Sequence, residues 1–190
     1  MKIGSVVVAI ALASACALSQ PFPEKRVELS FSGGLQSISS GSGASSAVFL
    51  LTPRVGYFAL GGLEVEGEGT FAFAGGSDPA YMFNGILSYN FPLRGRAVPF
   101  ILAGYGVANS VPTFNVPLLS YSLAQLGVLN VGVGMKALLA DNVAMRVEYR
   151  YQKFSGTQSP TTVDFLMYPL SSEKIDVRLS SVLAGFSILL

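Results

Sequence analysis

Apolar and polar residues alternate along most of the chain from Arg26 to its end. The pattern is regular in residues 143–151, where the large apolar residues take the odd positions and Arg146, Glu148 and Arg150 take the even ones. Successive side chains of a β-strand point to opposite faces, so this period of two predicts strands with one apolar and one ionic face. Such strands suit a soluble protein with its charges in water, or a membrane barrel with its charges inside.

The alternation predicts eight strands. They cover residues 26–36, 47–57, 63–73, 81–91, 98–108, 126–138, 143–154 and 175–190. Pro53 lies inside the second strand and has no N–H to donate, which predicts a bulge or a kink there. Gly104 and Gly106 obscure the faces of the fifth strand. A change of parity near Ser180 and Ser181 predicts a bulge in the eighth.

The connections between these strands alternate in length. Residues 58–62, 92–97 and 139–142 form short turns, and residues 37–46, 74–80, 109–125 and 155–174 form mostly longer loops. Outer-membrane barrels have short periplasmic turns and longer external loops. An even number of strands places both termini of the chain on the periplasmic side, together with every short turn. The sequence therefore predicts an all-β fold, an eight-stranded antiparallel up-and-down transmembrane β-barrel.

Composition favours the membrane alternative. The mean hydropathy is +0.52 and charged residues make up 12% of the chain, which is about half of the share in typical soluble domains. Beyond the N-terminus, no run of about 18 apolar residues could cross a bilayer as a helix. The chain has 12 Lys and Arg against 11 Asp and Glu, so no basic surface for nucleic acid is expected.

The first nineteen residues predict a cleaved signal peptide, which leaves residues 20–190 as the barrel domain. Lys2 precedes a short apolar run over residues 3–12, and small residues follow with possible cleavage after Ala15, Ala17 or Ser19. The single cysteine, Cys16, lies in this leader, so no disulfide framework is expected. Lipidation of this cysteine is an alternative to plain cleavage.

One stretch of the chain carries a family resemblance. It consists of the glycine-spaced strand 132–136, the turn Ala140-Asp141-Asn142 and a strand that ends in Glu-Tyr-Arg-Tyr at residues 148–151. With the leader and the eight alternating segments, it resembles the small outer-membrane barrels of the OmpA/OmpX type over residues 26–190. The resemblance implies a bacterial outer-membrane location and contact with outer-membrane lipid. The chain departs from the type by ending in Leu190 instead of Phe and by lacking Trp.

No catalytic chemistry is predicted. The chain has no histidine, which removes Ser-His-Asp triads, histidine metal sites and histidine general bases. No glycine pattern stands in the strand-to-helix context that binds nucleotide phosphates. We therefore expect no enzyme activity, no catalytic residues, no cofactor and no metal.

Nine charged residues share the polar faces of the predicted strands. An eight-stranded barrel is narrow enough for side chains to fill it, and a buried charge requires a partner. We expect a structural network inside the barrel, with a pore lining or an ion site as the alternatives. Its members are Glu28, Arg54, Glu64, Glu66, Glu68, Lys136, Arg146, Glu148 and Arg150.

Three functions fit these observations. The first is a monomeric outer-membrane protein with a structural or surface-interaction role in envelope integrity or adhesion. Its loops at residues 109–125 and 155–174 contain apolar residues that either contact an external ligand or protein or pack locally. The second is a small porin-like channel for ions or small solutes. The third is a secreted lipocalin-like barrel that binds an apolar ligand, which requires the charged faces to lie in water.

Overall fold

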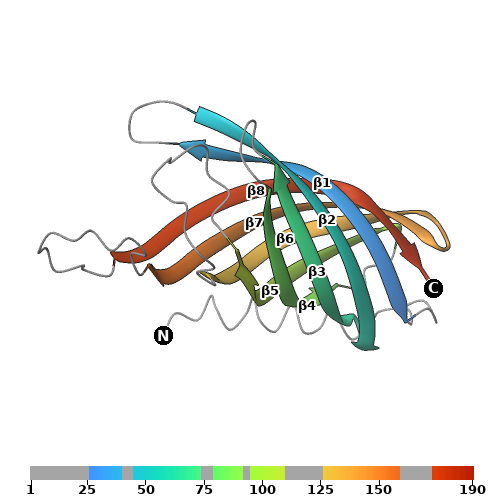
Figure 1. The fold of residues 1–190 in the computed structure, drawn as a ribbon. Coiled ribbons are helices and arrows are strands. Elements are labelled where there is room, and N and C mark those ends of the chain that lie inside the picture. Colours follow the sequence, from blue (N-terminus) through green and yellow to red (C-terminus); the bar gives the residue numbers. More distant parts are fainter. Residues whose placement is uncertain (1–25, 40–44, 74–78, 92–94, 110–125, 159–172) are drawn as a thin grey trace, which may run out of the picture.

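The computed structural model of the chain describes residues 26–39, 45–73, 79–91, 95–109, 126–158 and 173–190. The strands are β1 (Val27–Ser39), β2 (Ser45–Leu60), β3 (Leu63–Phe73), β4 (Ala80–Asn90), β5 (Ala97–Ala108), β6 (Leu126–Ala140), β7 (Val143–Gln158) and β8 (Glu173–Leu189). They form one closed antiparallel barrel in which β8 pairs with β1 (Figure 1). This confirms the predicted fold. Among the described residues, no helix has the length and apolarity needed to span a membrane.

The pairing register is staggered around the barrel. Successive partners lead from Val27 through Tyr57, Val65, Leu87, Ala103, Val131, Tyr151 and Ser180 to Ser37, which is ten residues beyond Val27 on β1. A stagger of this kind tilts the strands to about 40° from the barrel axis. The resulting barrel is narrow, and its interior is filled by side chains.

The two ends of the barrel differ. The turn end carries the short connections β2–β3, β4–β5 and β6–β7, the start of β1 and the end of β8. The loop end carries the connections β1–β2, β3–β4, β5–β6 and β7–β8. The predicted signal peptide, Cys16 and most of the loops at residues 109–125 and 155–174 lie outside the described residues.

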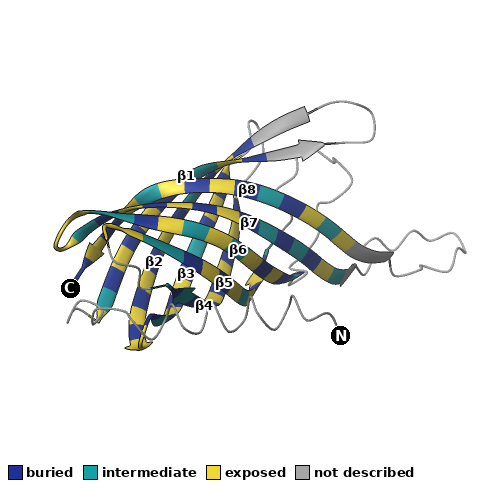
Figure 2. Cartoon of the chain, turned by 180° about the vertical axis from the view of Figure 1, so that it is seen from behind, coloured by how far each residue is buried: buried dark blue, intermediate teal, exposed yellow. Residues whose placement is uncertain are grey.

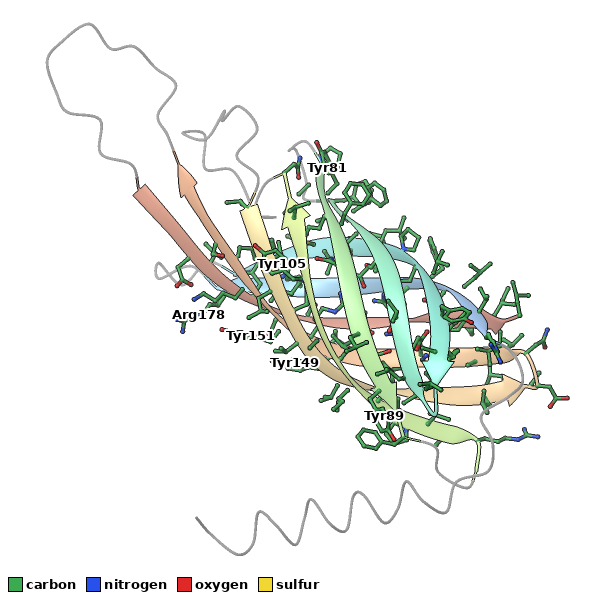
Figure 3. All side chains as sticks on the ribbon, turned by 90° about the horizontal axis from the view of Figure 1, so that it is seen from below. Tyr81, Tyr89, Tyr105, Tyr149, Tyr151 and Arg178 are labelled. Carbon is green, nitrogen blue, oxygen red and sulfur yellow. The ribbon has the colours of Figure 1, made fainter. Side chains whose placement is uncertain are left out.

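Buried and exposed residues alternate along each strand wherever the structure describes the side chains (Figure 2). Val147 and Tyr149 are 38% and 51% exposed, whereas Glu148 and Arg150 are 1% exposed. The apolar parity therefore faces outward and the ionic parity inward. Tyrosines lie toward both ends of the outer face, for example Tyr89 near the turn end and Tyr81 near the loop end (Figure 3). This arrangement matches the aromatic girdles at the two interfaces of a membrane barrel.

Of the bulge or kink predicted at Pro53, the bulge is wrong, because the register does not shift there. This residue pairs in register with Phe31 of β1. On the other side, the pairing of β2 with β3 omits Thr52 and Pro53 and then resumes with the same register. The missing N–H of proline is thus accommodated by a local break in the ladder. The hydroxyls of Thr52 and Thr70 lie 3.3 Å apart across that break.

The predicted bulge at Ser180 and Ser181 is also wrong. The register of β8 is continuous through both residues, against β1 and against β7. The sequence shows an apparent change of parity because Leu179 and Leu183 are apolar residues on the inward parity, where both are buried. The barrel interior is therefore partly apolar, which explains the pattern without a bulge.

Candidate functional site

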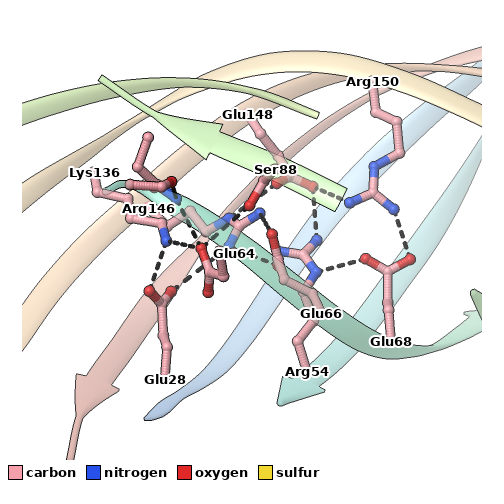
Figure 4. A network of polar contacts seen from close by, with 12 residues as sticks. Glu28, Arg54, Glu64, Glu66, Glu68, Ser88, Lys136, Arg146, Glu148 and Arg150 are labelled. Carbon is pink, nitrogen blue, oxygen red and sulfur yellow. Dashed lines mark hydrogen bonds and ion pairs between the residues drawn. The ribbon is translucent and has the colours of Figure 1, made fainter. Parts of the chain in front are cut away.

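All nine charged residues of the predicted network lie inside the barrel, and each is at most 5% exposed. They come from five strands: one each from β1, β2 and β6, and three each from β3 and β7. Because every second residue of a strand points inward, the three glutamates of β3 and the charged residues of β7 form two facing rows. Figure 4 shows that these rows meet across the interior.

Two arginines and two glutamates form the part of the network nearest the loop end. Arg54 donates from Nε to Glu68 at 2.5 Å and from Nη2 to Glu148 at 2.6 Å. Arg150 contacts the same two carboxylates, at 2.6 Å to Glu68 and 2.8 Å to Glu148. Each charge in this group of four therefore lies between two opposite charges. This alternation is the arrangement that best offsets the cost of removing four ions from water.

Arg146 links this group of four to the turn end. It donates to both oxygens of Glu66, at 2.9 and 3.3 Å, and to Glu148 at 3.0 Å. Its Nη1 also lies 3.6 Å from Glu28. The guanidinium carbon lies 4.5 Å from the centre of the Phe100 ring, which adds a cation–π contact.

Lys136 occupies the turn end of the network. Its Nζ lies 2.6 Å from Glu28 and 2.8 Å from Glu64. Ser88 and Asn90 donate further hydrogen bonds to Glu64, at 3.2 and 3.0 Å. One cation thus faces two carboxylates here, and neutral donors from β4 support the second carboxylate.

Charge balance differs between the two parts of the network. Three arginines face three glutamates toward the loop end: Arg54, Arg146 and Arg150 contact Glu66, Glu68 and Glu148. Toward the turn end, one lysine faces two glutamates, of which Glu28 also lies 3.6 Å from Arg146. The removal of one carboxylate therefore has different consequences at the two ends.

Inward-facing glycines make room for the large groups. A Cβ placed on Gly134 of β6 would overlap the ring of Phe100, which pairs with it across the β5–β6 ladder. A Cβ on Gly56 of β2 would overlap the carboxylate of Glu64. Both positions therefore require a residue without a side chain, so that the phenylalanine ring and the carboxylate can reach the centre of the barrel.

Amide side chains continue the network toward the loop end. Asn84 donates to Glu68 at 2.9 Å, Asn130 donates to Asn84 at 3.0 Å, and Gln152 donates to Asn130 at 2.8 Å. This relay of three amides joins β4, β6 and β7. It separates the ionic part of the interior from the part nearer the loop end.

The loop end of the interior is apolar, a feature that the alternation pattern did not predict. Here buried apolar residues of two clusters project inward from seven strands. They are Val48, Leu50, Ala72, Ala80, Met82, Ala108, Leu126, Val128, Phe154, Leu179 and Leu183. We call this set the apolar layer. These residues occupy positions that point into the barrel. In a short stretch of sequence, an inward apolar residue looks the same as an outward, lipid-facing one.

The sequence also matches a known family. The model of the outer membrane protein beta-barrel domain matches residues 5–171, which is most of the chain. The chain belongs to this family of outer-membrane β-barrels. No curated protein matches the sequence significantly.

Solved structures of outer-membrane barrels share the fold at low sequence identity. Neisserial surface protein A aligns with a TM-score of 0.62 and 17% identity, covering 86% of this chain and 96% of that one. OprG from Pseudomonas aeruginosa aligns with a TM-score of 0.55 and 14% identity, covering 87% and 97%. AlkL gives a TM-score of 0.52 and 17% identity, covering 90% and 93%. At these identities the likeness concerns the fold alone.

Family and geometry together place this outer-membrane barrel in the bacterial outer membrane, embedded in lipid. The prediction of a secreted lipocalin-like barrel is wrong, because it requires Glu148 and Arg150 to face water and both are buried in the interior. Within the described ranges, no group of His, Cys, Asp or Glu side chains could hold a metal ion. The interior is therefore described by its ion pairs, its amide relay and its apolar layer.

Proposed function

We propose that this barrel is a structural and surface-interacting protein of the outer membrane whose interior is closed to ions, with no catalytic role. The nine charged residues act as a structural network that holds opposite walls of the barrel together. The loops at residues 109–125 and 155–174 act as the contact region for an external ligand or protein, and the barrel is a monomer. Short turns on the periplasmic side and longer loops outside follow the rule for such barrels.

The observation that carries this proposal is the ionic group of four at the centre of the interior. Arg54 and Arg150 each bridge the same two carboxylates at 2.5–2.8 Å. Hydrated ions could pass only if these bonds opened, and opening them would leave buried charges unpaired. The apolar layer lies on the loop side of this group, and a narrow apolar constriction is a barrier to hydrated ions.

Conductance across planar bilayers tests the closed interior. The purified barrel should show no steady channels, in the wild type or in Lys153→Gln, a change at an exposed ion pair with Asp176. Steady channels whose ion selectivity changes in Glu66→Gln but not in Lys153→Gln would overturn the proposal in favour of a small pore. Glu66 suits this test because it is buried and held by Arg146.

Cell-based assays test the structural and surface roles. A strain without the protein should become sensitive to detergents and large antibiotics, or should lose adhesion. A variant in which a short turn replaces residues 159–172 should restore envelope integrity but not adhesion, because the barrel remains and the external contact region is shortened. A deletion strain that behaves as the wild type in both assays would contradict both roles.

A further inference from the structure

The wall formed by β1 and β8 differs from the rest of the interior. Apart from Glu28, its inward residues carry none of the charges, and most of them are small. From the turn end to the loop end, the paired inward positions are Ser30 with Ser187, Ser32 with Gly185, Gly34 with Leu183, and Gln36 with Ser181. We call this line of residues the β1–β8 seam.

Most of the unpartnered polar atoms of the interior lie on this seam. Among the described residues, eleven buried side-chain nitrogen and oxygen atoms make no hydrogen bond within the protein, and six of them belong to the seam. They include the hydroxyls of Ser30, Ser32, Ser181 and Ser187. The amide of Gln36 lacks a partner for both its nitrogen and its oxygen, although the residue is 0% exposed.

Buried polar atoms without a protein partner point to bound water. A buried donor or acceptor that forms no hydrogen bond costs about 1–3 kcal/mol, so nearly all of them are satisfied in native proteins. Water fills this role where several polar groups converge on a small site. In two pairs of the seam, both residues carry a polar side chain and lie directly opposite each other across the β1–β8 ladder. These pairs are Ser30 with Ser187 and Gln36 with Ser181. One water molecule between such partners can bond to both.

Leu183 divides the seam into two polar stretches. It pairs with Gly34, and a Cβ placed on that glycine would overlap the leucine side chain. The leucine therefore lies over the glycine, between Ser32 on the turn side and the Gln36–Ser181 row on the loop side. Leu183 also belongs to the apolar layer. It is the one large apolar side chain of the seam.

The loop-side stretch lies next to a separation of the strands. Pairing between β1 and β8 ends at Ser37 with Ser180, one residue beyond the Gln36–Ser181 row. Pairing between β7 and β8 continues seven residues further, to Gln158 with Glu173. Figure 1 shows the β1–β2 and β7–β8 hairpins diverging from this point. The upper polar row therefore stands where the wall of the barrel opens.

We propose that the β1–β8 seam is a hydrated path by which water and protons cross the barrel, and that Leu183 is its narrowest point. Water hydrogen-bonded in a file along the hydroxyls relays protons, whereas a hydrated ion cannot pass the leucine. The seam borders the ionic network without containing any of its charges. Ser181, Leu183 and Gly185 pair across the β7–β8 ladder with Arg150, Glu148 and Arg146, and Ser30 pairs with Arg54 across the β1–β2 ladder. Passage of protons along the seam rests on the proposed function, an interior closed to ions, and needs no open pore.

Proton flux into vesicles tests this path. The full-length barrel is reconstituted in vesicles that contain a pH-sensitive dye, and an external pH step is applied. Wild-type protein should carry protons faster than protein-free vesicles. Leu183→Ala should raise the rate severalfold, and Gln36→Leu should lower it toward the protein-free rate.

Leu102→Ala is the matched control. Leu102 is a buried leucine on β5, on the side of the barrel opposite β1, and the change removes the same atoms. Its rate should equal that of the wild type. Equal acceleration by both leucine variants, or a wild-type rate equal to that of protein-free vesicles, would overturn the proposal. Salt conductance in the wild type would instead contradict the closed interior, so the two failures are distinguishable.

Nuclear magnetic resonance on the unmodified protein gives a second test that does not depend on the folding of variants. In lipid nanodiscs, the side-chain amide of Gln36 and the hydroxyl of Ser32 should show magnetisation transfer from water. The amide of Asn130, which donates to Asn84 and Val128, serves as the protein-bonded reference. Transfer at Gln36 no stronger than at Asn130 would overturn the proposal.

Discussion

Replacement of Glu148 by glutamine is expected to destabilise the barrel more than any other single neutralisation of a glutamate in the network. Its carboxylate accepts hydrogen bonds from three arginines: Arg54 at 2.6 Å, Arg150 at 2.8 Å and Arg146 at 3.0 Å. Glutamine has nearly the same shape, so the change removes the charge and leaves the packing intact. Three buried guanidinium groups would then share the carboxylates of Glu66 and Glu68, with Glu28 at 3.6 Å from Arg146 as the next nearest.

The magnitude follows from the burial of these charges. Removal of one partner from a buried ion pair leaves an uncompensated charge and costs about 3–5 kcal/mol. The side chains involved are at most 1% exposed, so water does not screen the remaining charges. We therefore expect the free energy of unfolding of Glu148→Gln to fall by about 3–5 kcal/mol.

Glu28→Gln provides a matched control with the same chemical change at an equally buried site. Glu28 faces Lys136, which retains its contact with Glu64 at 2.8 Å. Arg146, which lies 3.6 Å from Glu28, keeps its contacts with Glu66 and Glu148, so the change leaves no cation without a partner. Loss of a single hydrogen bond then predicts a cost of about 1 kcal/mol.

Urea titration of the reconstituted barrel measures both variants. The chain has no tryptophan, so unfolding is followed by far-ultraviolet circular dichroism and by the heat-dependent gel mobility of the folded barrel. The prediction requires a clearly lower urea midpoint for Glu148→Gln than for Glu28→Gln. Equal midpoints would refute the assignment of unequal charge balance to the two parts of the network.

Three further substitutions test the packing and the membrane face in the same assay. Gly134→Val should cost about 1–3 kcal/mol because its side chain overlaps a buried ring, whereas Gly67→Val should be tolerated because a Cβ there meets only one backbone oxygen at 4.0 Å. Val147→Arg, in the middle of the outward apolar face, should cost about 2–4 kcal/mol, against about 0–1 kcal/mol for Leu60→Arg at the turn end; similar values would contradict the membrane placement. Lys153→Gln, at an exposed ion pair, should leave the urea midpoint unchanged, and a large fall would show that this pair is not screened.

The alternation of residues determined the strands and, except in the glycine-containing β5, their two faces. β3 was predicted from Leu63 to Phe73 with the bounds that the structure has, and every other strand differs by at most a few residues at its ends. The strand prediction succeeded because one face of a barrel strand contacts lipid and the other faces the interior. Each residue type therefore indicates one of only two orientations. The alternation places Glu148 and Arg150 on one face, and the low content of charged residues and the alternating loop lengths then favour the inner side for that face.

Only the tertiary structure decided which residues meet. Arg146 contacts Glu66 from 80 positions away in the sequence, and this contact depends on the closure of the barrel and on the stagger between strands. The apolar layer and the β1–β8 seam are also products of closure, because Leu179, Leu183 and Gln36 share a parity with the charged residues but reach different levels of the interior. A period of two assigns a face to each side chain. It carries no information about height along the barrel axis, which the register of all eight strands sets together.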